Sequence, residues 1–164
     1  MAGSSTSISF GSPRKPPLPL FAASDIFVGA PLKFVEPVSA STSTGRFVQM
    51  VGSSNDKPIG VAYESVAAGE PVAVLDRGEW PQGYAGGSIQ PGQYTGVVNA
   101  SEAKHPVSEV TVKYPVLGKV AGASGTATWS IGVALDAANP NERFAYYLDP
   151  IQLSSSNANA GVLG

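Results

Sequence analysis

The sequence predicts an all-β fold, either a small sandwich or a partly closed barrel, on the strength of three observations. Short apolar runs alternate with turn residues along most of the chain, no segment keeps an apolar period of 3.6 residues, and one strand-pair pattern occurs twice. A chain of 164 residues is long enough for one domain with extensions. It can therefore bury an apolar core without a disulfide or a metal.

The repeated pattern begins with the tetrapeptide Ile-Gly-Val-Ala and continues into a second apolar run. The tetrapeptide occurs at 59–62 and again at 131–134, an offset of 72 residues, and at the same offset the apolar run 72–75 aligns with 144–147. Each copy is an apolar run, a polar turn and a second apolar run, which predicts a hairpin-like pair used twice about a rough pseudo-twofold. Gly60 and Gly132 lie inside strand patterns, which indicates a bulge, a bend or a close backbone approach.

Eight strands are expected, bounded by turn-forming clusters such as 52–56, 68–70, 91–92 and 139–141. Alternation is clearest at 110–114, where Val110, Val112 and Tyr114 would share one face. Residues 64–68 and 101–104 are each compatible with one helical turn, and 39–44 is a polar loop. The expected strands are Leu32–Val38, Arg46–Val51, Pro58–Tyr63, Pro71–Asp76, Gln93–Val98, Val107–Tyr114, Thr128–Leu135 and Arg143–Leu148.

The two ends of the chain differ in composition from the middle. Residues 1–24 contain no acidic residue and several prolines, which exclude a helix and favour an extended arm that orders on a partner. Residues 25–153 form the β-domain, and residues 154–164 are predicted to be a flexible tail. The residues expected to contact the partner are Pro16, Pro17, Leu18, Pro19, Leu20 and Phe21.

Charge and composition limit the classes of partner. Only 13% of residues are charged, which suits a protein packed against its own copies or a scaffold, although a secreted or thermally robust monomer is an alternative. The net charge of −2 without a basic cluster argues against nucleic-acid binding. The absence of cysteine excludes thiol chemistry and thiolate metal sites. No apolar run approaches the ~20 residues that span a bilayer, so no membrane association is expected.

Catalytic groups are scarce, and the sequence predicts neither an enzyme nor a cofactor. The single histidine, His105, lies between Lys104 and Pro106, which predicts an exposed loop rather than a catalytic site. Asp136, Asn139, Asn141 and Glu142 offer oxygen ligands, but their spacing fits no calcium loop and is typical of side chains that cap turns.

Four aromatic residues, Trp80, Tyr84, Tyr94 and Trp129, raise the alternative of a surface on which sugars stack. Aromatic side chains in β-domains more often fill cores and interfaces. A secreted carbohydrate-binding β-sandwich that uses Trp80 and Tyr84 therefore stays open as an alternative from a different functional class.

The runs Arg46–Val51, Pro58–Ala62 and Ala67–Leu75 together resemble the pattern of tailed-phage head decoration proteins, also called capsid cement proteins. The second Ile-Gly-Val-Ala run, followed by an apolar strand, resembles their closing segment. The likeness covers roughly residues 30–150. It does not extend to the Pro-rich arm or to the stretch 80–92, which is expected to be a loop.

The resemblance implies a small β-barrel or β-tulip domain that assembles as a homotrimer on the outer surface of the virion head. Such a trimer would bind the major capsid protein and stabilise the shell without catalysis. The composition of the N-terminal arm, which is not part of the resemblance, suggests the arm as the contact. Another phage structural role, in the tail, connector or fibre, is the alternative within the same class.

Overall fold

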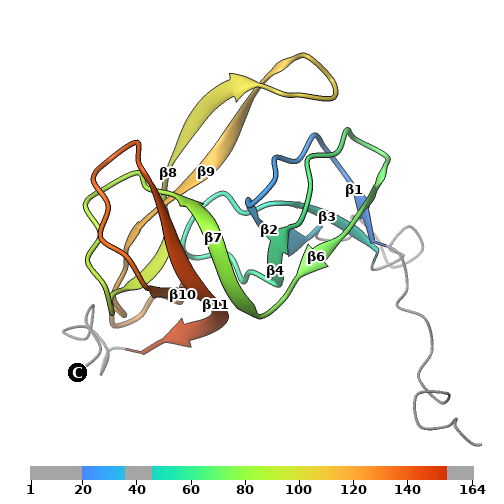
Figure 1. The fold of residues 1–164 in the computed structure, drawn as a ribbon. Helices are drawn as coiled ribbons and strands as arrows, with labels where there is room; N and C mark the ends of the chain where they lie inside the picture. The colour runs from blue at the N-terminus through green and yellow to red at the C-terminus, as the bar shows by residue number, and fades with distance from the viewer. Residues whose placement is uncertain (1–19, 36–45, 155–164) are drawn as a thin grey trace, which may run out of the picture.

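The computed structural model describes residues 20–35 and 46–154, and these fold into eleven β-strands with no helix among them (Figure 1). The strands are β1 (Leu20–Ala22), β2 (Pro31–Phe34), β3 (Phe47–Met50), β4 (Gly60–Ala62), β5 (Pro71–Val72), β6 (Val74–Leu75), β7 (Gly78–Tyr84), β8 (Tyr94–Lys104), β9 (Thr111–Lys119), β10 (Thr128–Ala134) and β11 (Arg143–Leu153). The predicted all-β barrel class is therefore confirmed.

The first six strands form one small barrel, here called barrel 1. Their order is β5-β1-β3-β2-β4-β6, and Ala73 alone separates the two end strands, so the sheet returns on itself. All pairs are antiparallel except β1 with β3. Closure leaves no long strand edge unpaired within this sheet.

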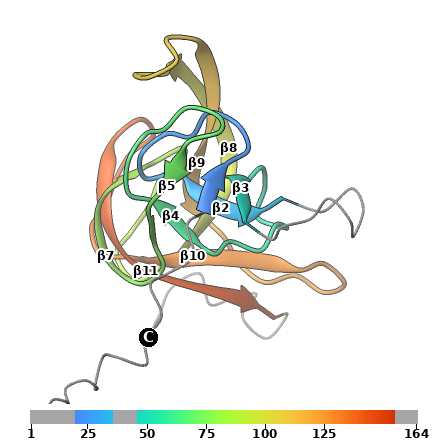
Figure 2. The same ribbon diagram turned by 90° about the vertical axis from the view of Figure 1, so that its right-hand side faces the viewer.

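The remaining five strands form barrel 2, in the order β7-β11-β10-β8-β9. A parallel bridge between Ala85, just after β7, and Leu117 of β9 joins its two end strands. Strands β8 and β9, of 11 and 9 residues, are longer than the equivalent β2 and β3, of 4 residues each, and their hairpin stands out from the barrel body (Figure 2).

The two barrels repeat one another strand by strand. The sequence repeat is therefore confirmed, and it extends well beyond the two Ile-Gly-Val-Ala tetrapeptides. Val61 pairs with Leu75, and Val133 pairs with Tyr147, at the 72-residue offset found in the sequence. The preceding strands match at a shorter offset, because Pro31 pairs with Val61 just as Tyr94 pairs with Val133. One barrel of about sixty residues is thus used twice.

Loop hydrogen bonds repeat in the same way. Gly69 N donates to Ala22 O, and Asn141 N donates to Ala85 O, at matching positions of the two barrels. Gly69 and Asn141 both adopt a left-handed backbone, with φ of 89° and 73°. Glycine adopts this conformation without steric cost, and asparagine tolerates it. The same turn therefore forms with glycine in barrel 1 and with asparagine in barrel 2.

Each barrel has an apolar interior, and where one interior has a large side chain the equivalent position of the other can have a small one. Barrel 1 has Leu20 facing the interior where barrel 2 has Gly83. A Cβ at Gly83 would lie 2.7 Å from the ring of Tyr146, and 3.1 Å from that of Phe144. Barrel 2 therefore accommodates two buried rings because glycine makes room for them, as dense packing requires.

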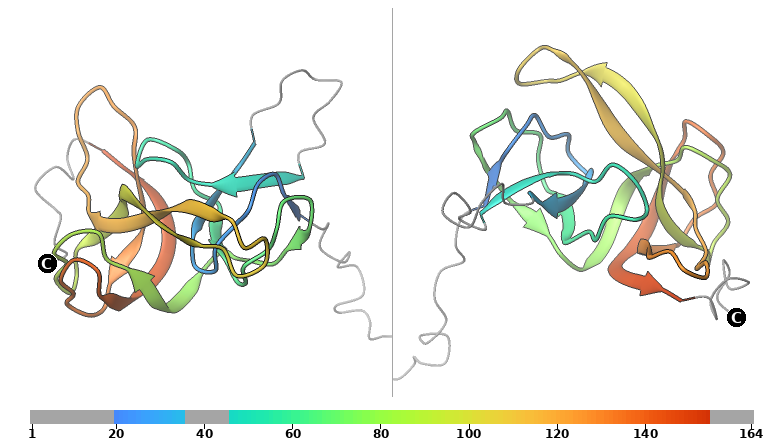
Figure 3. Two further views of the ribbon diagram at one scale, coloured as in Figure 1. Left: turned by 90° about the horizontal axis from the view of Figure 1, so that it is seen from above. Right: turned by 180° about the vertical axis from the view of Figure 1, so that it is seen from behind.

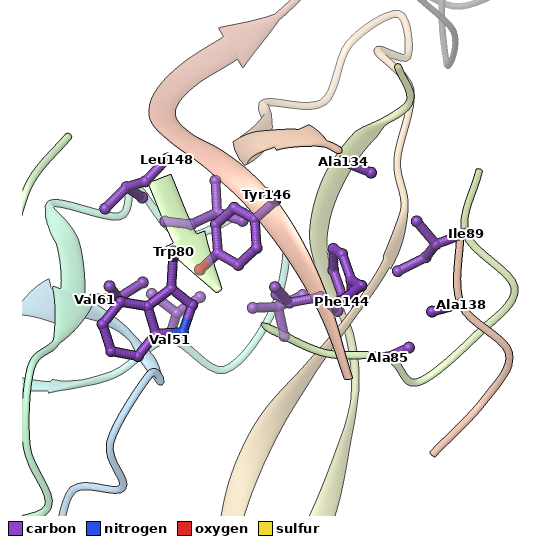
Figure 4. Packing of buried hydrophobic residues seen from close by; sticks show 13 residues of the cluster. Val51, Val61, Trp80, Ala85, Ile89, Ala134, Ala138, Phe144, Tyr146 and Leu148 are labelled. Atoms are coloured by element: carbon purple, nitrogen blue, oxygen red, sulfur yellow. The ribbon is translucent and has the colours of Figure 1, made fainter. Parts of the chain in front are cut away.

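The barrels pack against each other through the outer face of barrel 1. Val51 and Val61, whose side chains lie outside that barrel, join a buried cluster with Trp80 and the interior of barrel 2, and Leu75 packs on the same cluster. Figure 4 shows Trp80 close to both valines, with Tyr146 nearby. Arg77 and Asp149, which are equivalent positions, form an ion pair of 3.3 Å nearby.

Several predicted boundaries are wrong. The sequence places the end of the arm at residue 24, but Leu20–Ala22 forms β1 between β3 and β5. It places a loop from Trp80 onward, but Gly78–Tyr84 is a strand. This strand, β7, pairs with β11 along one edge, and a strand paired along one edge tolerates proline and glycine. No helical turn forms at 64–68 or at 101–104, and the latter belongs to β8.

Candidate interaction surface

His105 is fully buried, which corrects the expectation of an exposed loop. It lies at the tip of the β8–β9 hairpin, and its Nε2 donates to the carbonyl oxygen of Ile26 at 2.8 Å. Its Nδ1 accepts from the backbone N–H groups of Val107 and Ser108, at 3.2 and 3.1 Å. These partners fix the tautomer and use both ring nitrogens, so His105 acts as a structural link between the hairpin and barrel 1.

Asp25 strengthens the same link. One carboxylate oxygen accepts from the Ser108 hydroxyl at 2.7 Å, and the other accepts from Ala68 N at 3.0 Å. These two hydrogen bonds, the Ser108 one first, lower the pKa of Asp25 below its ordinary value. Seen from above, the hairpin reaches from barrel 2 across to barrel 1 (Figure 3). The polar groups at its tip therefore hold the two barrels together.

The acidic loop at 136–142 is built as a turn, as the capping interpretation predicts. Asp136 Oδ2 accepts from Ala145 N at 3.1 Å, and Asn139 Nδ2 donates to Glu142 at 2.9 Å. Across residues 20–35 and 46–154, no three potential ligands among His, Asp and Glu gather into a metal site.

Three of the four aromatic residues considered for sugar stacking pack against other side chains, and the fourth, Tyr94, is half-buried in β8. Trp80 is only 8% exposed because it lies between the barrels. Tyr84 packs edge-on against Tyr114 and under Arg143, and Trp129 lies beneath Lys57. The Trp80 ring faces needed for a sugar are thus occupied by protein.

Two buried polar atoms, Trp80 Nε1 and Tyr146 Oη, have no hydrogen-bond partner among the described residues. Burial raises the pKa of Tyr146 far above its ordinary value, so this phenol stays neutral. Both atoms lie in the packed region that joins the barrels.

The arm residues predicted to contact a partner fall into two groups. Leu20 and Phe21 are half-buried in β1, where Leu20 pairs with Val72 and Phe21 pairs with Pro71. Pro16, Pro17, Leu18 and Pro19 lie outside the described residues. Any arm that precedes the barrel therefore ends at residue 19.

Ten large apolar side chains of residues 20–35 and 46–154 are exposed, and four of them form two surfaces that the sequence did not predict. The first, here called the rim of barrel 1, is formed by Phe34 and Phe47, which are 46% and 43% exposed. The second, here called the outer face of barrel 2, holds Leu135 and Tyr147, which are 45% and 44% exposed. Exposed apolar groups of this size mark contact surfaces more often than catalytic ones.

A scan against models of known protein families and a search of curated proteins both gave no match. No helix in the described part of the chain is long and apolar enough to cross a membrane.

Proposed function

We propose that this chain is a phage head decoration protein that binds the outer surface of the capsid lattice and stabilises the head. The observation that carries the proposal is the resemblance of the runs 46–51, 58–62 and 67–75 to decoration proteins. In the structure these runs supply β3, β4, β5 and β6, which lie together in the wall of barrel 1. The second Ile-Gly-Val-Ala run, which resembles the closing segment of those proteins, lies in β10 of barrel 2.

Two further observations support a role in adhesion. The chain carries little charge, and exposed apolar residues lie on both of its barrels. His105, considered for catalysis, and Asp136, considered as an ion ligand, both make hydrogen bonds that stabilise the fold. Both properties suit a protein whose work is to hold neighbouring subunits together.

In this proposal the segment 1–19 supplies the contact with the major capsid protein. Leu18, flanked by Pro16, Pro17 and Pro19, is its apolar anchor, and burying one such side chain contributes about 1.5–3 kcal/mol. One arm binds weakly after its ordering cost is subtracted. Three arms on a trimer act at high effective concentration, which raises the overall affinity by about 10²–10⁴.

The test is co-sedimentation of the protein with DNA-filled phage heads that lack their own decoration protein. We expect the full chain to pellet with heads at saturable stoichiometry, and the chain without residues 1–19 to stay in the supernatant. Leu18→Ser in the full chain should weaken binding, with Val107→Ser, an exposed hairpin residue, as the matched control. Failure of the full chain to bind heads, or labelling of particles only at the tail, would contradict the proposal.

A further inference from the structure

The contact between the two barrels within the chain involves surfaces that have counterparts in the repeated fold. It covers an outer row of barrel 1, in which Pro31, Val61 and Leu75 lie side by side on β2, β4 and β6. Val61 is completely buried there. The surface that covers this region includes Val97, which belongs to the same buried cluster as Val61 and lines one small cavity with Pro31.

Because the barrels are equivalent, the covered row has a counterpart on barrel 2. The residues at the matching positions are Tyr94, Val133 and Tyr147, and their pairing across β8, β10 and β11 repeats that of the first row. Here none of the three is fully buried, and Tyr147 is 44% exposed. The outer face of barrel 2 is therefore an apolar row without the cover that barrel 1 receives.

The covering surface has a counterpart as well. Val97 pairs with Leu117, and the matching pair in barrel 1 is Phe34 with Val48. Val97 is 6% exposed, whereas Phe34 is 46% exposed. The covered row and the Val97 part of its covering surface thus occur a second time as exposed side chains, and the two exposed copies lie on different barrels.

We propose that a second copy of this chain docks the rim of its barrel 1 on the outer face of barrel 2, and so repeats the internal contact between molecules. Charge does not decide this pairing, because Lys33 at the rim already forms an ion pair with Asp56 at 3.0 Å, although Glu79 lies opposite Tyr147 on the outer face. The two surfaces differ, so the contact is heterologous and joins copies head to tail into a ring or a chain. Such a contact goes beyond the proposed function and does not depend on it.

The first test is sedimentation velocity of the full chain over roughly 10–100 μM, which detects association with a dissociation constant in the micromolar range. We expect the wild type to form species larger than a monomer as concentration rises. Tyr147→Lys alters the outer face and Phe34→Glu alters the rim, so each should weaken association at least about tenfold. Val110→Lys, on an exposed hairpin residue distant from both surfaces in the sequence, is the matched control and should associate as the wild type does.

The second test mixes the two variants in equal amounts. A head-to-tail contact predicts that the mixture recovers dimers but nothing larger, because Tyr147→Lys keeps an intact rim and Phe34→Glu keeps an intact outer face. Leu135→Glu replaces Tyr147→Lys if circular dichroism shows that the latter is unfolded. A monomeric wild type, wild-type association by either variant, or a mixture that stays monomeric would each overturn the proposal.

Discussion

Gly60 and Gly132 occupy the same position in the two barrels and meet the same neighbour. A Cβ at Gly60 would collide with the carbonyl oxygen of Leu75, and a Cβ at Gly132 would collide with that of Tyr147. Leu75 and Tyr147 are themselves equivalent, as the registers of β4–β6 and β10–β11 show. The glycine of the repeated tetrapeptide is therefore required because two backbones come close together at this point.

Replacing either glycine with alanine should destabilise the protein by about 1–3 kcal/mol, the usual cost of forcing an extra methyl group into a packed site. The obstacle is backbone, which cannot turn aside as a flexible side chain does. The measurement is the free energy of unfolding from urea denaturation of Gly60→Ala and Gly132→Ala. Gly87→Ala is the matched control, because a Cβ there meets nothing within 4 Å. Unchanged stability in both test variants would contradict this explanation of the repeat.

Truncation at two points separates the arm from the barrel. Removing residues 1–19 should leave the unfolding midpoint nearly unchanged, because the described barrel begins at Leu20. Removing residues 1–24 also deletes β1 and leaves β3 and β5 without the strand between them. We therefore expect the longer deletion to unfold at a much lower temperature or to be insoluble. Equal thermal stability of the two truncated chains would show that β1 is dispensable.

His105→Leu should lower the free energy of unfolding by about 1–3 kcal/mol, because it leaves buried polar groups without partners. The carbonyl of Ile26 and the N–H groups of Val107 and Ser108 lose their bonds to the ring. Hydrogen exchange should also become faster at the amides of Val107 and Ser108. Val107→Ala, an exposed neighbour, should change stability by less than about 0.5 kcal/mol. Unaltered exchange at the hairpin tip would argue against the link.

Asp25 makes part of the stability depend on pH. Its folded pKa lies below the unfolded value, so its carboxylate stabilises the fold above about pH 4 and loses that effect as the pH falls through the folded pKa. The difference in unfolding free energy between wild type and Asp25→Ala should be constant near neutral pH and should shrink below about pH 4. Ser108→Ala removes the hydroxyl donor and should reduce this pH-dependent part. A difference that stays the same down to about pH 2, well below the ordinary pKa of an aspartate, would contradict the assignment.

The sequence predicts the central strands well because their signals are local. The Ile-Gly-Val-Ala words and the alternating runs around them lie in strands with the expected pairing. The extent of the duplication is harder to find, because matching positions differ in residue type. Gly69 corresponds to Asn141, and Leu20 with Val72 corresponds to Gly83 with Phe144. The first pair keeps the backbone conformation and the second keeps the combined side-chain volume, although the residue types differ.

The misplaced elements depend on contacts that no local pattern records. β7 contains Pro81 and two glycines, which normally argue against a strand, yet it pairs along β11. His105 lies beside a lysine and a proline but is buried by Phe27 and by barrel 1, which are far away in the sequence. The two exposed apolar surfaces become visible only when one barrel is compared with the other.

Cryo-electron microscopy of the assembled phage particle tests the proposed role most directly. We expect density for two linked small barrels at regular positions over the whole outer surface of the head, with the segment 1–19 against the major capsid protein. Density confined to the tail or the connector, or a head surface without this protein, would contradict the proposed role.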